Sequence, residues 1–166
     1  MLPVGTAIGG GVRPRGLAAN GTAVGDLYGA AVWTPDGSGG YVLTQLDGQA
    51  VNGISNDASL AVGIVPALYW LSSGGSWSPA QTFPGGCSGA RAVAGTSRRV
   101  AMNDCPFGNK STPAYIDPPF VAPVQLGGAG PNNIGGDAKG ISPNGQYVGG
   151  SGSYRGSLVG FYWKLF

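Results

Sequence analysis

The seven aspartates are the clearest candidates for acid–base chemistry in this chain, because it contains neither histidine nor glutamate. Without histidine, a Ser-His-Asp triad and a histidine-based zinc site are excluded. Two paired aspartates could hydrolyse a glycosidic bond, but no spacing favours a particular pair, and most of these residues lie in turn sequences. We therefore expect a protein that is not an enzyme and holds no metal or cofactor. The seven positions are Asp26, Asp36, Asp47, Asp57, Asp104, Asp117 and Asp137.

The only two cysteines, Cys87 and Cys105, lie on either side of an expected hairpin turn centred on Thr96. Residues equidistant from a hairpin turn face each other across the ladder, so this spacing predicts a disulfide. A disulfide in turn indicates an oxidising compartment. The alternative is a pair of buried free thiols, since a zinc site would need ligands that the chain lacks.

Three residues in loops are candidates for binding a ligand or a partner. Trp77 lies in a Gly/Ser-rich loop, 71–80, that has no counterpart elsewhere in the chain. An exposed tryptophan can stack on a sugar ring or anchor a protein partner, although this one can also fold back over its own unit. Tyr154 and Arg155, in the loop 150–157, form a second candidate of the same kind.

Four copies of one pattern supply the elements that must position these residues. Each copy has a small residue, an apolar residue, a polar turn, a strand containing Val-Gly or its equivalent, and an aromatic-rich strand. The apolar residues alternate with a period of two, and 33 glycines and 13 prolines oppose helices. The pattern therefore predicts an all-β chain of stacked units. The copies span 15–33, 51–70, 90–116 and 138–163.

A fourth strand is expected after three of the copies, at 41–46, 80–84 and 120–126. Four short strands in roughly 40–45 residues are typical of a β-propeller blade. We therefore expect one four-repeat, β-propeller-like domain over 1–166, closed by pairing of the strand 2–8 with the last unit. The expected repeats are approximately 12–46, 47–84, 85–126 and 127–166.

The aromatic residues that recur in the closing strand of the units are expected in the core between the units. They are Trp33, Trp70 and Trp163, with Tyr69 and Tyr162.

Composition narrows the partners and the location of the protein. Only 10% of the residues are charged, the net charge is +2, and the arginines are scattered rather than clustered. This distribution disfavours nucleic-acid binding, and no apolar run is long enough for a membrane span. A low charge density suits a protein that is secreted or packed against others.

The repeats resemble the HAF repeat of bacterial extracellular proteins. That family has a Leu-Gly-rich strand, a hairpin of the form A-x-G-I-N-x-x-G-x-V-V-G, and an Ala-Phe-Leu-Trp-like strand. The resemblance implies secretion and a propeller-like fold but no defined activity, so no catalytic residue is carried over. The matches in the fourth copy are Leu126-Gly127-Gly128, Ala138, Gly140-Ile141-Ser142, Gly145, Val148-Gly149 and Phe161-Tyr162-Trp163.

Three functions remain open at this point. The first is a non-enzymatic, extracellular or cell-surface propeller that acts as a structural or interaction module with a protein or glycan partner. The second is a glycan-binding, lectin-like module that uses the loop aromatics. The third is a subunit of an extracellular filament formed by exchange of the terminal strands between copies.

Overall fold

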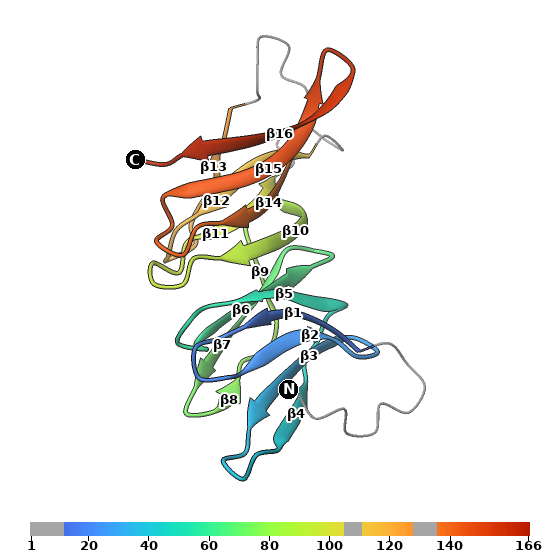
Figure 1. The fold of residues 1–166 in the computed structure, drawn as a ribbon, viewed down its shortest axis with the longest axis vertical. Helices are drawn as coiled ribbons and strands as arrows, with labels where there is room; N and C mark the ends of the chain where they lie inside the picture. Colours follow the sequence, from blue (N-terminus) through green and yellow to red (C-terminus); the bar gives the residue numbers. More distant parts are fainter. Residues whose placement is uncertain (1–11, 105–110, 128–135) are drawn as a thin grey trace.

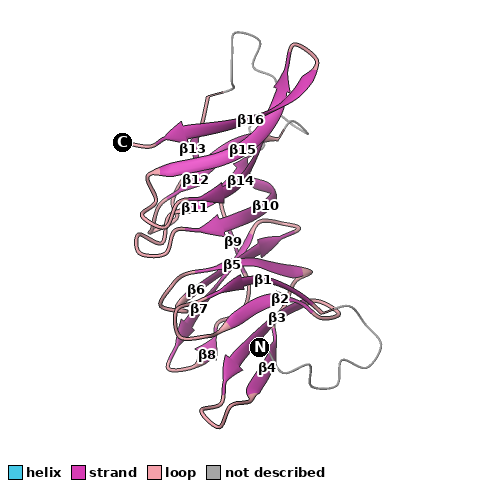
Figure 2. Ribbon diagram, in the orientation of Figure 1, coloured by secondary structure: helices cyan, strands magenta, loops and turns pink. Residues whose placement is uncertain are grey.

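A computed structural model describes residues 12–104, 111–127 and 136–166, which form sixteen strands and no helix (Figures 1 and 2). The first sheet, in spatial order, contains β1 (Arg13–Leu17), β2 (Ala23–Asp26), β3 (Ala30–Pro35) and β4 (Tyr41–Gln45). The second contains β5 (Ala50–Ile54), β6 (Leu60–Ile64), β7 (Leu68–Ser73) and β8 (Ser76–Trp77), and β9 (Gln81–Thr82) also pairs with β7. The third contains β10 (Gly86–Val93), β11 (Val100–Asp104), β12 (Thr112–Ile116) and β13 (Val124–Gln125). The fourth contains β14 (Gly136–Ile141), β15 (Tyr147–Tyr154) and β16 (Ser157–Lys164).

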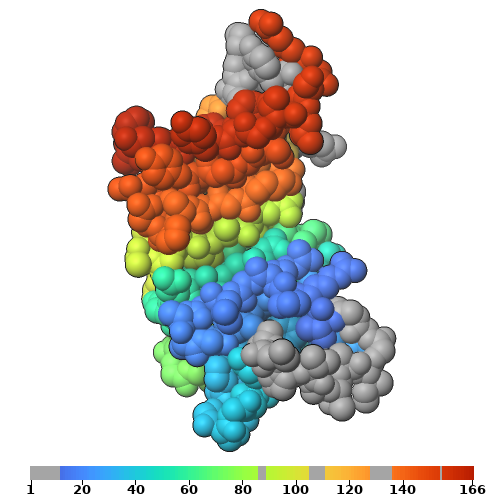
Figure 3. Space-filling view, in the orientation of Figure 1, coloured from blue at the N-terminus to red at the C-terminus, as the bar shows by residue number. Residues whose placement is uncertain are grey.

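The expected all-β, blade-like architecture is confirmed. Within every sheet the neighbouring strands are antiparallel, and the expected fourth strands are present as β4, β9 and β13. The four sheets lie face to face in chain order, as successive layers along the long axis of the molecule (Figure 3). No helix in the described ranges has the length and apolar character needed to cross a membrane.

The described sheets form an open arc, in which the first and fourth sheets lie at opposite ends (Figure 1). Ring closure was expected through pairing of the strand 2–8, but this segment lies outside the described residues. The described part of the fourth sheet has three strands, with β16 at its outer edge. The expected closure therefore stays a prediction.

The core consists of three apolar clusters, one between each pair of consecutive sheets. Trp70 fills the first interface, Phe83 and Met102 lie in the second, and Val148 lies in the third. Each inner sheet is therefore apolar on both faces, as expected for stacked units that cannot bury a face alone. Among the described sheets, the fourth has a partner on only one of its faces.

The innermost strands β1, β5, β10 and β14 lie next to one another in that order, and each contains a β-bulge at the same place. The extra residues are Arg15, Asn52, Arg91 and Lys139. A bulge bends a strand and increases its twist, and it redirects the extra side chain. The repeated bulge therefore curves all four inner strands in the same way.

The register corrects one detail of the repeat alignment. Gly25, Gly63 and Gly150 are equivalent, because a Cβ at each would collide with the carbonyl oxygen of the neighbouring inner strand. The expected match in the fourth copy was Gly149, which is one residue too early. The alignment was wrong because the fourth turn, Ser142 to Tyr147, has the same length as the second turn, Ser55 to Leu60, and places Val148 opposite Ile141.

Candidate functional site

The outward face of the fourth sheet is the most distinctive surface of the described residues. Tyr69, Tyr115 and Tyr162 occupy the same register position in the second, third and fourth sheets. Tyr69 and Tyr115 pack against the apolar cluster formed with the following sheet, whereas 78% of Tyr162 is exposed. The turn geometry likewise makes Tyr147 equivalent to the fully buried Leu60. Tyr162 was expected in the core, and this expectation was wrong because no described sheet follows the fourth.

The small residues of the inner strands show the same contrast between the covered sheets and the fourth sheet. A Cβ on Gly16 would lie 3.4 Å from the Cα of Gly53, and one on Gly53 would lie 3.2 Å from the Cα of Ala92. The small residue that begins each unit therefore allows the next inner strand to approach closely. The equivalent Gly140 faces open space, with no atom of the described residues within 4 Å of an added Cβ. Gly149, its pairing partner, is equally open.

The outward face of the first sheet is also exposed, and it carries the residues that in the other sheets pack against the preceding sheet. Leu17 occupies the register position of Ile54, Val93 and Ile141, each of which packs in the interface with the preceding sheet. Leu17 is 66% exposed, and Leu43 on the same face is 45% exposed. The arc thus ends in two different apolar surfaces.

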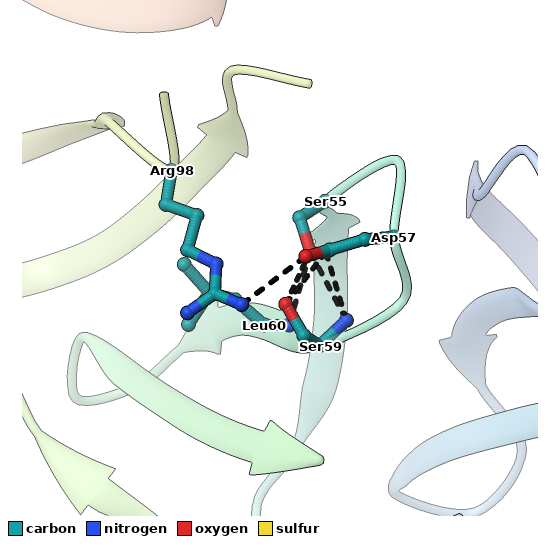
Figure 4. Close-up of polar contacts among 5 residues, drawn as sticks. All are labelled: Ser55, Asp57, Ser59, Leu60 and Arg98. Carbon is teal, nitrogen blue, oxygen red and sulfur yellow. Dashed lines mark hydrogen bonds and ion pairs between the residues drawn. The ribbon is translucent and has the colours of Figure 1, made fainter. Parts of the chain in front are cut away.

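In each sheet a turn joins the first strand to the second, and polar contacts link these turns to one another on one side of the stack. The Ser55 hydroxyl accepts hydrogen bonds from the backbone N–H groups of Ser59 (3.2 Å) and Leu60 (3.0 Å) and donates one to Asp57 Oδ1 (2.6 Å). From the third sheet, Arg98 Nη2 reaches Asp57 Oδ2 at 3.1 Å (Figure 4). The ion pair therefore joins the turns of consecutive sheets.

Asp57 remains ionised because of these contacts. Burial acts to raise its pKa, but hydrogen bonds from Ser55 and Ser59, followed by Arg98, hold the pKa of Asp57 well below its ordinary value. Ser142 and Asn144 repeat the turn in the fourth sheet, where an amide oxygen replaces the carboxylate and accepts the Ser142 hydroxyl at 2.7 Å. The Asp57 carboxylate therefore stabilises a turn and links it to the third sheet.

A second polar network links the third and fourth sheets. Asn103, which is fully buried, donates to Asp137 Oδ1 (3.0 Å) and accepts from the backbone N–H of Ala138 (2.8 Å). Ser111 and Lys139 also bind Asp137, at 3.1 and 3.0 Å. Burial acts to raise the pKa of Asp137, but Lys139 and Ser111 bring it below its ordinary value. The network orients the two sheets relative to each other.

Asp104 and Asp137 do not form a catalytic pair between the third and fourth sheets. The Asp104 side chain binds Gln125 (3.0 Å), whereas Asp137 lies on the other face of the third sheet with Asn103. Two carboxylates on opposite faces of one sheet cannot flank the same glycosidic bond. The described residues also include no group of three Cys or Asp side chains that could hold a metal ion.

The three loop candidates are placed differently. Trp77 lies in β8, and its half-buried side chain packs with Ala80 against the cluster between the first two sheets. Arg155 is an exposed turn residue with a positive φ of 50°. Tyr154 ends β15 opposite Ser157, so Tyr154 and Arg155 belong to a tight hairpin far from Trp77 along the chain. A role for these residues in ligand binding stays a prediction.

The predicted disulfide also remains untested, since Cys105 lies outside the described residues. The backbone of β10 does affect the argument that two residues at equal distances from the hairpin turn face each other. β10 contains a second bulge between Gly86 and Gly89, so Gly86 pairs with Asp104 and Cys87 falls inside the bulge. Equal distances from the turn therefore do not translate into direct pairing here.

The comparisons with solved structures support the fold alone. The chain is similar to TolB from Acinetobacter baumannii, with a TM-score of 0.65 and 12% identity over 93% of this chain and 41% of that one. It is also similar to the β-propeller domain of Cps50 (Swd1) from Myceliophteria thermophila, with a TM-score of 0.59 and 12% identity over 97% of this chain and 57% of that one. No family model and no curated protein match the sequence. The chain spans less than two thirds of either structure, and it has an all-β, β-propeller-like fold of four antiparallel sheets.

Proposed function

We propose that this protein is a non-enzymatic interaction module of the HAF-repeat type that acts at the cell surface or outside the cell. The observation that carries this proposal is the open outward face of the fourth sheet, where Tyr147 and Tyr162 stand at positions that are covered in the other sheets. Tyrosine is enriched at protein interfaces because its ring is apolar while its hydroxyl tolerates water.

Other properties agree with this function. The two tyrosine rings contact each other, with centroids 6.4 Å apart, and Leu158 on the same strand face is 82% exposed. Exposed aromatic and aliphatic side chains on one face of a sheet are typical of association sites in soluble proteins. The small number of charged residues and the cysteine pair support an extracellular location. A glycan-binding role for Trp77 has less support, because the ring packs against the core.

Site-specific photocrosslinking in the producing cells tests the proposal. Tyr162 is replaced by p-benzoylphenylalanine, a larger photoreactive aromatic residue that the exposed position can accommodate, and the cells and their medium are irradiated. We expect a light-dependent adduct in the surface or extracellular fraction. The matched control places the same residue at Val121, which is 73% exposed in a loop of the third sheet and should give no specific adduct. The proposal is wrong if Tyr162 gives no adduct, or if the protein stays inside the cell.

A further inference from the structure

We propose that the outward face of the fourth sheet binds the first sheet of a second copy of this chain, head to tail. This inference rests on the proposed function, because it identifies the partner of the same open face. The contact is sheet against sheet and needs no exchange of terminal strands. The argument comes from the three interfaces that already exist inside the chain.

Those interfaces follow a rule that is repeated from unit to unit. At the first two interfaces, a glycine near the end of the inner strand touches the equivalent inner strand of the next unit, Gly16 against Gly53 and Gly53 against Ala92. At the second and third interfaces, a tyrosine on the third strand, Tyr69 or Tyr115, packs on the apolar cluster shared with the next sheet. Each sheet therefore presents to the following sheet a small residue, usually glycine, on its inner strand and apolar side chains on its other strands.

The fourth sheet presents the same kind of surface, a glycine together with a tyrosine, and no other described sheet packs against it. Gly140 occupies the position of Gly53, and Tyr162 occupies the position of Tyr69. Gly140 has open space where Gly53 meets the backbone of the next sheet, and Tyr162 is exposed. The outward face of the fourth sheet thus has the residues with which the inner sheets bind the next sheet, but no described sheet packs on it.

The surface that would complete this interface is present on the outward face of the first sheet. In the second sheet, Ile54 and Trp70 are buried against the first sheet. Leu17 and Trp33 hold the equivalent positions on the outward face of the first sheet, where Leu17 is largely exposed and Trp33 is half-buried. A second copy stacked on the fourth sheet would place its Leu17 over Gly140, as Val93 lies over Gly53.

The two surfaces differ, so the contact is heterologous and not a symmetric face-to-face pairing. A heterologous contact either closes into a ring of a few copies or continues as a filament, depending on the rotation between copies. Both outcomes agree with the inference, and the mass of the assembly distinguishes them.

Sedimentation velocity of the purified full chain, over a concentration series up to about 0.5 mM, tests the inference. We expect the wild type to assemble, whereas Tyr162→Glu and Leu17→Glu should each be monomeric. An equimolar mixture of the two variants should form dimers and nothing larger, because it contains one intact surface of each type. Val121→Glu is the exposed control and should assemble like the wild type. Circular dichroism checks that every variant is folded.

Each other outcome overturns the inference. A wild type that stays monomeric at all concentrations shows that a second copy is not the occupant. If Tyr162→Glu prevents assembly but Leu17→Glu does not, the contact is between two fourth sheets. In both cases the proposed function survives if photocrosslinking at Tyr162 gives an adduct with a different protein, whose mass separates it from a doubled chain.

A second variant tests the same contact without adding charge. Gly140→Val fills open space in the isolated chain, so we expect it to fold normally. In the proposed contact its side chain would meet the backbone of the second copy, and assembly should be lost. Normal assembly of Gly140→Val would overturn the proposed geometry.

Discussion

Gly53 lies directly against Ala92 of the neighbouring sheet, so closely that a Cβ on Gly53 would come within 3.2 Å of the Ala92 Cα and 3.3 Å of the Val93 nitrogen. Real Cβ atoms seldom approach backbone atoms this closely, and backbone cannot rotate away as a flexible side chain can. The distance between the second and third sheets therefore depends on a residue without a side chain at this position. Gly16 has the same role between the first two sheets.

We predict that Gly53→Val destabilises the fold by about 1–3 kcal/mol, the usual cost of overpacking, because the second and third sheets must separate. Gly140→Val should change the stability by less than about 0.5 kcal/mol, since no atom lies near the added group. Urea denaturation at low protein concentration, followed by tryptophan fluorescence, gives both values. Equal losses in the two variants would contradict the role assigned to the close contact.

The pKa of Asp57 predicts how stability depends on pH. Its pKa is lower in the folded protein than the ordinary value of 3.8, so the unfolded chain binds more protons in acid. The stability that Asp57 contributes is therefore fully present above about pH 4 and is lost as the pH falls through the folded pKa. Asp57→Asn keeps the turn, as Asn144 does in the fourth sheet, but removes this titration. We expect the difference in unfolding free energy between wild type and Asp57→Asn to be constant from pH 7 to about pH 4.5 and to decrease below that.

Arg98→Gln is the control for this measurement. The hydrogen bonds from Ser55 and Ser59 contribute more to the lowered pKa of Asp57 than Arg98 does, and the ion pair is about half exposed, with side-chain exposures of 44% and 55%. An exposed ion pair contributes only about 0–1 kcal/mol. The Arg98→Gln variant should keep most of the acid dependence. If it removes that dependence completely, Arg98 and not the turn sets the pKa.

We predict that Asn103→Asp is more harmful than Asn103→Ala at pH 7. The alanine leaves the N–H of Ala138 without its acceptor, which costs about 1–3 kcal/mol when such a group is buried. The aspartate keeps an acceptor but places a second carboxylate where Asn103 now lies 3.0 Å from Asp137. Like charges at that distance raise the pKa of one partner. The excess penalty of Asn103→Asp should therefore shrink between pH 7 and pH 5 in urea denaturation, and a pH-independent excess would contradict the predicted repulsion.

The repeat pattern was sufficient to predict strands and units, because alternation, turns and spacing are local properties. The expected strands at 41–46 and 120–126 correspond to β4 and β13. Local patterns were less reliable for register, since one residue shifts every side chain to the other face. Gly149 was matched in place of Gly150 for this reason, and the bulge at Cys87 invalidated the argument from equal distances.

Trp77 and Tyr162 show that the burial of an aromatic side chain could not be predicted from its local sequence. Trp77 lies in a segment with the composition of a loop, yet its side chain packs on the core. Tyr162 has the same sequence context as Tyr69, so sequence alone assigned both residues to the core. Only their neighbours in space distinguish them, because burial depends on whether another sheet follows.

The amino-acid sequence by itself determined an all-β chain of four similar units, since each unit carries its own turns and strand periodicity. The tertiary structure decided which of the equivalent residues are covered. Burial is a property of the stack and not of the unit, so identical positions are interior in the middle of the arc and exposed at its ends. The stack leaves Tyr162 at one end and Leu17 at the other, and these two surfaces carry the functional proposals.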